Sequence, residues 1–223
     1  MSLFRDRSQA GERLAALLPT FPAESRVVVL GLPRGGVPVA LELARALSAP
    51  LDIFSVRKLG APTQPELALG AIATGGIYVV NQDLIEFMGI GPGVIDALVA
   101  RERAELERRE QEYRGDSQAI DLAGATVLMV DDGLATGASM RAGLTALREA
   151  RPERVIVAIP VAPPETLAAI RRLTDQVLCI ATPDPFYSVG AWYARFDQVS
   201  DDEVRRCLQE ARSWAAPQQA KSP

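Results

Sequence analysis

The chain has 223 residues, of which 48% are hydrophobic, and this predicts a single domain spanning 1–223 with a sizeable core. The net charge of −4 argues against a nucleic-acid-binding surface, and the absence of histidine excludes Ser-His and Cys-His nucleophile pairs and His-based zinc sites. With only two cysteines, no apolar membrane span and no signal-peptide pattern, we expect a cytoplasmic protein that binds neither nucleic acid nor membrane.

The first part of the chain predicts a helix followed by a strand–loop–helix unit. Residues 5–18 are amphipathic and predict a helix. The β-branched run at 27–30 predicts a buried strand, which leads into the glycine-rich loop GLPRGGVP at 31–38 and a helix over about 39–47.

The loop at 31–38 has a pattern that suits a phosphate ligand. Arg34 offers a guanidinium fork for phosphate oxygens, and Gly35 and Gly36 let backbone N–H groups approach them. The alternative is a tight turn whose arginine is simply solvated.

A third apolar segment, 51–56, ends in Arg57 and Lys58. Two cations at the carboxyl end of a strand favour an anion site, because ligands of open α/β sheets bind at that edge. The alternative is that they are ordinary surface charges. The following stretch, 59–70, contains two prolines and little periodicity, and predicts a mobile loop.

The middle of the chain predicts a small hairpin and two helices. Residues 71–73 and 77–80 flank Thr74-Gly75-Gly76 and predict paired strands, and Asn81 is suited to cap a helix over 83–88. The longest helical pattern is 94–114, where acidic and basic residues alternate. It predicts a solvated helix that is a candidate homodimer surface.

The stretch VLMVDDGLATGAS, 127–139, is the most informative part of the sequence. It reads as a buried strand at 127–130, two adjacent carboxylates, a loop of small or hydroxylated residues, and a helix over 140–147. Such a loop leaves backbone N–H groups free at a helix N-terminus and attracts a phosphate monoester.

The two carboxylates of this stretch, Asp131 and Asp132, cannot contact a phosphate without repulsion, so they need hydroxyl groups or a cation beside it. The stretch therefore predicts a binding site for a phosphorylated sugar, and magnesium is the cation that would fit. The alternative is a turn in which both carboxylates only cap or solvate the backbone.

The last part of the chain predicts a strand at 155–160, a helix over 163–173, a strand at 177–180 and a final helix from 200 to about 214. The tail, about 215–223, is predicted to be disordered. Because strands and helices alternate, the chain predicts an α/β fold with a mostly parallel central sheet and helices on both faces.

The segment TPDPFYSVGAWYARF, 182–196, concentrates aromatic residues in a chain that is only 5% aromatic. Prolines and glycines interrupt it, so a structured loop is expected. Planar side chains such as Phe186, Tyr187 and Trp192 suit stacking on a planar base. The alternative is that they plug the loop onto the sheet.

The run at 127–139 resembles the motif of type I phosphoribosyltransferases that binds 5-phosphoribosyl 1-pyrophosphate (PRPP). Ser139 stands where that motif usually has threonine, and it keeps the hydroxyl. LPRGGVPVA at 32–40 and VRKLGAP at 56–62 occur in the same order in stand-alone bacterial proteins predicted to be phosphoribosyltransferases. The resemblance covers about 27–196.

The resemblance implies transfer of a 5-phosphoribosyl group from PRPP to a nitrogenous base, with Mg²⁺ as cofactor, release of pyrophosphate, and a purine or related base as the favoured acceptor. It also implies a small hood over the base at about 182–196, to which Phe186, Tyr187 and Trp192 belong, and a flexible lid at 59–70.

The implied site residues fall into three groups. The catalytic residues would be Asp131, Asp132, Arg57 and Lys58, with both aspartates holding the metal mostly through ligand and water. The pyrophosphate would lie on Pro33, Arg34, Gly35 and Gly36. The 5′-phosphate would lie on Ala135, Thr136, Gly137, Ala138 and Ser139.

Two other functions stay open at this point. The chain could be a regulator that binds PRPP without turnover, acting through a partner protein. It could also be an RNA-binding regulator on this fold, although the excess of acidic over basic residues argues against that.

Overall fold

A computed structural model describes residues 2–62 and 64–215, and its framework is a five-stranded parallel sheet. Neighbouring strands in the order β2-β1-β6-β7-β8 all run parallel. The strands are β1 (Val27–Gly31), β2 (Leu51–Ile53), β6 (Thr126–Val130), β7 (Arg154–Val161) and β8 (Gln176–Ala181). The predicted parallel sheet is confirmed, although the segment predicted at 51–56 divides between β2 and the start of the next strand.

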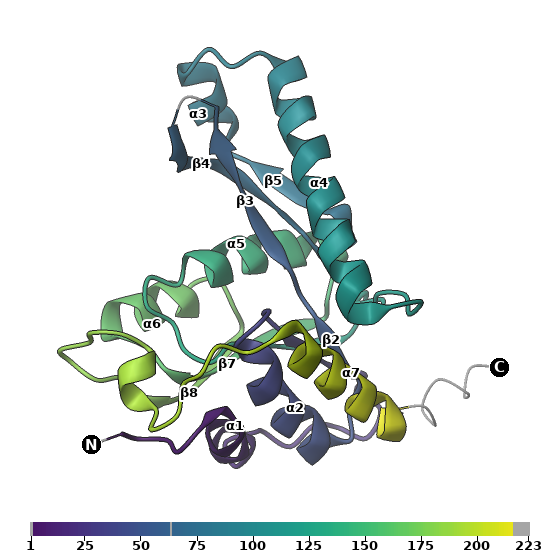
Figure 1. Ribbon diagram of the computed structural model, residues 1–223, viewed down its shortest axis with the longest axis vertical. Coiled ribbons are helices and arrows are strands. Elements are labelled where there is room, and N and C mark those ends of the chain that lie inside the picture. Colours follow the sequence, from purple (N-terminus) through teal and green to yellow (C-terminus); the bar gives the residue numbers. More distant parts are fainter. Residues whose placement is uncertain (1, 63, 216–223) are drawn as a thin grey trace.

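Helices cover both faces of this sheet (Figure 1). One face packs against α1 (Arg7–Ala15), α2 (Gly36–Leu47) and α7 (Asp201–Ala215), and the other against α5 (Ala138–Leu147) and α6 (Pro164–Arg171). A short 3-10 turn, η2 (Arg148–Ala150), follows α5. Successive side chains of each strand serve opposite faces, which explains the continuous apolar runs in the sequence.

A second, antiparallel sheet stands apart from the first. It contains β3 (Val56–Ala61), β4 (Gln64–Ala73) and β5 (Tyr78–Val80) in that order, and α3 (Gln82–Phe87) and α4 (Pro92–Arg114) pack against it. We call these five elements the arm, because Figure 1 shows them rising from the parallel sheet.

The predicted hairpin is confirmed, with η1 (Thr74–Gly76) as its turn. The predicted cap is also confirmed, since Asn81 Oδ1 accepts a hydrogen bond from Leu84 N at 3.1 Å.

One expectation about the arm is wrong. The stretch 59–70 is not a loop, because β3 and β4 pair across most of it, with Leu59 opposite Gly70. Leu59 and Leu69 are buried beneath α4, and this tertiary contact outweighs the local loop signals. The prediction of a solvated α4 is confirmed for most of its surface, and Glu102, Glu110 and Arg114 are buried on its inner side.

The segment 182–196 is irregular apart from one short 3-10 turn, η3 (Gly190–Trp192), as the sequence predicts. It packs around Phe4 and Tyr193 in a small cluster beside the edge of the sheet. The predicted disordered tail lies outside the described residues from 216 onward. None of the helices among residues 2–62 and 64–215 has the length and apolar character needed to cross a membrane.

Candidate functional site

The segments that carry the predicted site residues meet at the carboxyl edge of the parallel sheet. Gly31, the last residue of β1, pairs with Val130, the last residue of β6. Leu32 N then donates to Val130 O at 2.9 Å, and Phe54 N donates to Gly31 O at 3.0 Å. The loop 31–38, the acidic pair and the entry to β3 therefore lie side by side.

The two glycines after Arg34 are required by this close approach. A Cβ added to Gly35 would lie 2.1 Å from Asp132 Oδ2, and one added to Gly36 would lie 2.6 Å from Val130 O. The clash at Gly36 is with backbone and the clash at Gly35 is with the end of the Asp132 side chain, so the loop that is predicted to hold pyrophosphate rests directly on the acidic pair. The peptide bond between Pro33 and Arg34 is cis.

The acidic pair is half-buried and only partly neutralised. Asp131 Oδ1 accepts from Asp132 N at 2.9 Å, and Asp132 Oδ2 lies 2.8 Å from Arg7 Nε. Burial raises the pKa of Asp131, and the neighbouring charge of Asp132 raises it further. Burial also raises the pKa of Asp132, although Arg7 opposes this. Only Asp132 is in contact with a guanidinium, an arrangement that favours an added cation or hydroxyl donors beside Asp131.

A divalent cation at this place would take few ligands from the protein. Among the described residues no group of three or more acidic, histidine or cysteine side chains is arranged to hold a metal. Two adjacent carboxylates nevertheless suit Mg²⁺, which keeps several waters and usually binds through one or two carboxylates together with substrate phosphates. Asp131 and Asp132 therefore fit a magnesium ion bound mostly through ligand and water.

Arg7 is a site residue that the sequence analysis missed. It comes from the start of α1, 125 positions before its partner Asp132, and both side chains are 13% exposed. No local pattern distinguishes it from the other arginines of the chain, so only the fold reveals it.

Arg34 and Arg57 line one cavity of about 360 Å³ between the parallel sheet and the arm. Arg34 Nη1 lies 3.8 Å from Asp201 Oδ1, which also accepts a hydrogen bond from Tyr113 OH at 2.8 Å. Burial and the Asp201 carboxylate raise the pKa of Tyr113 to about 12. Arg108 and Arg109 of α4 line the same cavity.

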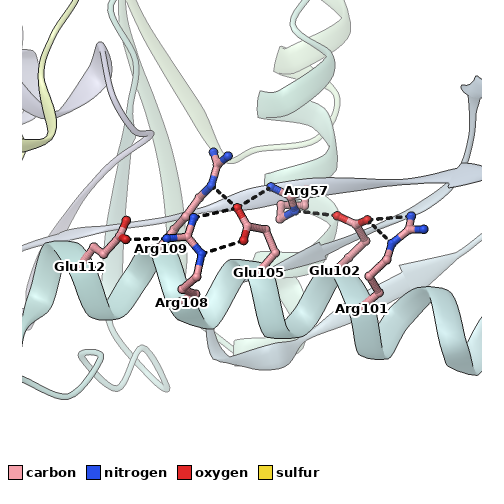
Figure 2. A network of polar contacts seen from close by, with 7 residues as sticks. All are labelled: Arg57, Arg101, Glu102, Glu105, Arg108, Arg109 and Glu112. Carbon is pink, nitrogen blue, oxygen red and sulfur yellow. Dashed lines mark hydrogen bonds and ion pairs between the residues drawn. The ribbon is translucent and has the colours of Figure 1, made fainter.

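Arg57 is held by carboxylates of α4 (Figure 2). Its Nε donates to Glu102 Oε2 at 2.7 Å, and its Nη1 lies 4.0 Å from Glu105 Oε1. Lys58 is exposed. Arg57 and Lys58 nevertheless line one further cavity of about 750 Å³, between β3 and the first half of α4.

A second cavity, of about 500 Å³, adjoins the acidic pair, and we call it the acidic-pair cavity. It is lined by Arg7, Arg34, Gly35, Asp132, Val189, Phe196, Gln198 and Val199. None of the three predicted hood aromatics is in this lining. Phe186 stacks on Trp192 with ring centroids 6.4 Å apart, and Tyr187 is 83% exposed.

The loop 135–139 forms a cradle at the N-terminus of α5. Gly137 has φ +68°, a left-handed conformation that favours glycine. Thr166 Oγ1 donates to Ala135 O at 2.7 Å, and Arg141 Nη1 donates to Thr136 O at 2.6 Å, so side chains hold the loop in place. The N–H groups of the first helical turn have no acceptor within the helix and suit an anion. The sequence analysis did not single out Arg141.

Comparisons with known proteins identify the family. The family model described as the phosphoribosyl transferase domain matches residues 10–193. A Mycobacterium tuberculosis protein, named provisionally as a phosphoribosyl transferase, is 44% identical over 211 residues, which make up 95% of this chain and 47% of that protein. The chain thus spans about half the length of the curated relatives it matches.

Two further relatives differ in how much they cover. The bifunctional protein PyrR of Halalkalibacterium halodurans is 31% identical over 99 residues, 41% of this chain and 55% of that protein. The crystal structure of TT1426 from Thermus thermophilus is 42% identical and has a TM-score of 0.83, covering 96% of this chain and 100% of that one.

The family match includes the acidic pair, the loop 31–38, the arm and the cradle at 135–139. The resemblance indicated by the three sequence motifs is therefore confirmed. The chain belongs to the family of proteins with a phosphoribosyl transferase domain, on the type I fold.

Proposed function

We propose that this protein transfers the 5-phosphoribosyl group of PRPP to a nitrogenous base and releases pyrophosphate, with Mg²⁺ as cofactor and a purine-type base as the favoured acceptor. The observation that carries the proposal is the contact between the loop 31–38 and the acidic pair, beside the cradle of α5. A sugar with a diphosphate at one end, hydroxyls in the middle and a phosphate at the other complements these three parts.

Each part has a role that follows from its chemistry. The carboxylates of Asp131 and Asp132 accept hydrogen bonds from the ribose hydroxyls and stabilise positive charge that develops at the anomeric carbon. Residues 135–139 anchor the 5′-phosphate through backbone N–H groups and hydroxyls. Holding both ends of the sugar fixes the reacting carbon relative to the base.

The leaving pyrophosphate is stabilised by the loop Pro33, Arg34, Gly35 and Gly36. Arg57, which shares a cavity with Arg34, and Lys58 add positive charge near the same edge. Asp131 and Asp132 would hold magnesium, mostly through ligand and water, and the ion would supply charge neutralisation for the leaving diphosphate.

The arm and the segment 182–196 surround the site. The β3–β4 hairpin takes the place of the predicted lid and shields the pyrophosphate from water, and 182–196, with Phe186, Tyr187 and Trp192, forms the hood. The chain acts as one domain in the cytoplasm, as a homodimer through α4, without nucleic acid or membrane as partners.

A PRPP-binding regulator without turnover is the second candidate. The ion pair between Arg7 and Asp132 favours it, because Arg7 holds a carboxylate oxygen that a ribose hydroxyl would otherwise contact. If that ion pair persists with PRPP bound, binding would occur without transfer.

Radiolabelled PRPP with Mg²⁺ and a panel of bases separates these candidates. Release of pyrophosphate with a base supports transfer, and binding of PRPP without release supports the regulator. Failure to bind PRPP would overturn both.

The matched variant carries Asp131→Asn and Asp132→Asn, which keep the side-chain size and remove both charges. We expect transfer to fall at least about 1000-fold, since each group that stabilises transition-state charge contributes about 10²–10³. The thermal unfolding profile checks that the variant is folded, and unchanged turnover would contradict the assignment.

A further inference from the structure

Arg7 connects three segments at the acidic-pair cavity that are far apart in the sequence. Its Nε is 2.8 Å from Asp132 Oδ2, its Nη1 donates to Asp197 O at 2.7 Å, and its guanidinium carbon lies 3.9 Å from the centroid of the Phe196 ring. Each contact uses a different part of the guanidinium, and together they hold the group at the cavity wall.

The backbone that carries Arg7 is itself anchored to the segment 182–196. Asp6 caps α1 by accepting from Gln9 N at 3.0 Å, and its Oδ2 lies 2.5 Å from Arg195 Nη2. Phe4 N donates to Trp192 O at 2.9 Å. The guanidinium is therefore placed before any ligand arrives, which lowers the entropy cost of using it for binding.

The unused donors of Arg7 fix the chemistry of an occupant. No acceptor among the described residues is recorded for its Nη2, and a guanidinium has donors only. The edge of a ligand that faces Nη2 must therefore carry a hydrogen-bond acceptor such as a carbonyl oxygen. An amino group there would be a second donor and could not form the hydrogen bond.

The rest of the lining is mixed in character. Val189, Val199 and Phe196 contribute apolar surface, and Gln198 and Arg34 contribute polar groups beside them. The volume of the cavity is about 500 Å³ and it is widely open to solvent, so one face of an occupant would stay exposed. The cavity also reaches Asp132, where the ribose would lie under the proposed function.

We propose that Arg7 determines the acceptor, and that the acceptor is a planar heterocycle with a carbonyl or carboxylate oxygen on the edge facing Arg7. This inference rests on the proposed function, because it places the base beside the sugar held by Asp132. A base that carries only amino substituents on that edge is rejected, since the Arg7 donors then lose their water without gaining a partner.

A purely supporting role for Arg7 makes a different prediction. If Arg7 only braced Asp132, its removal would weaken the grip on the sugar and slow transfer to every base alike. The ratio of kcat/KM between an oxygen-bearing base and an amino-substituted base separates the two roles. A weaker grip on the sugar lowers both values by the same factor and so leaves their ratio unchanged.

The experiment measures kcat/KM for hypoxanthine, orotate and adenine in the wild type, Arg7→Met and Arg7→Lys. We expect the wild type to prefer hypoxanthine or orotate over adenine. Arg7→Met should lower that preference about 10- to 100-fold, the effect of losing one hydrogen bond to a charged donor. Arg7→Lys keeps a charge beside Asp132 and should retain a KM for PRPP close to that of the wild type. Hypoxanthine and orotate as separate arms distinguish a carbonyl from a carboxylate.

Arg13→Met is the matched control. Arg13 lies on the same helix, is exposed, lies 5.0 Å from the centroid of the Phe4 ring and donates to Leu3 O, but does not line the acidic-pair cavity. Its removal should leave base preference unchanged. An equal loss for all bases in Arg7→Met, or a wild type that prefers adenine, would overturn the proposal.

If the protein binds PRPP but transfers nothing, base preference can still be measured as binding. A failure of the proposed transfer is then distinguished from a failure of the inference about Arg7. Equilibrium dialysis then measures binding of the three bases to protein saturated with PRPP and Mg²⁺. Binding of hypoxanthine or orotate but not adenine, lost in Arg7→Met, would support the inference even though transfer has failed. Absence of binding by all three bases would overturn it.

Discussion

Two clusters of charged side chains in this molecule differ in how completely they are neutralised. Beside β2, the guanidinium of Arg114 is 2.7 Å from Asp52 Oδ1 and 2.8 Å from Glu110 Oε2, and its Nη2 donates to Ile53 O at 3.0 Å. After β6, Asp131 and Asp132 have only Arg7 as a cationic partner among the described residues.

The first cluster holds the framework together. Thr74 Oγ donates to Glu110, and Asp52 Oδ2 accepts from Ile120 N at 3.2 Å, so the carboxylates are bonded on several sides. The cluster links β2, α4 and the turn of the arm, and its side chains are at most 10% exposed. Such a network tolerates burial because all its members are paired.

The second cluster retains charge that the protein does not satisfy. Burial of a carboxylate without a full set of partners costs stability, and such groups gather where a ligand supplies what is missing. Of these two clusters, the completely paired one belongs to the framework, and the incompletely paired one belongs to the candidate site.

The largest effect should come from breaking the paired cluster. Arg114→Met leaves Asp52 and Glu110 buried without their cation, and we expect a loss of about 3–5 kcal/mol in the free energy of unfolding. Chemical denaturation measures it. Arg108→Met is the control, since the Arg108 side chain, drawn in Figure 2, is 55% exposed and its removal should leave stability nearly unchanged. Equal effects of the two substitutions would remove the distinction between the clusters.

Next in size is a steric change at the candidate site. Gly35→Ala would place a methyl group 2.1 Å from Asp132 Oδ2, so the loop or the carboxylate must move. A displacement of about 1 Å costs on the order of 100-fold in rate, and we expect that loss in kcat/KM for PRPP.

Gly91→Ala is the matched control for this substitution. Gly91 has φ −67°, and an added Cβ would meet nothing within 4 Å. Activity should then equal that of the wild type. Full activity in Gly35→Ala would show that the contact between the loop and the acidic pair is dispensable.

The smallest effect concerns stability and pH. The pKa of Asp131 is raised in the folded state, so the folded protein binds a proton more readily than the unfolded chain. Stability is therefore lost as the pH rises from the ordinary aspartate pKa through the raised one. Asp131→Asn removes this loss, so the Tm of the variant should exceed that of the wild type increasingly from about pH 4 towards neutral pH.

Calorimetry across that range measures the difference, in the absence of PRPP and magnesium. Asp96→Asn, at an exposed position of α4, provides the control and should follow the wild type at each pH. A Tm for Asp131→Asn below that of the wild type at neutral pH would show that this carboxylate stabilises the fold.

The sequence by itself determined the family, the parallel sheet and the segments that form the loops. Buried strands such as 127–130 carry continuous apolar residues, and turns such as 133–139 carry small ones, because local geometry dictates both. Pairing and capping within one segment, as at Asn81, also follow from spacing along the chain.

Only the tertiary structure decided the partners of the charges. The antiparallel strands at 56–61 and 64–73 depend on burial beneath α4, and Arg57 turns towards Glu102 because that helix packs there. The contact of Arg7 with Asp132 joins residues 125 positions apart. Local patterns carry no information about such pairs, since a charged side chain finds its partner only once the elements have packed.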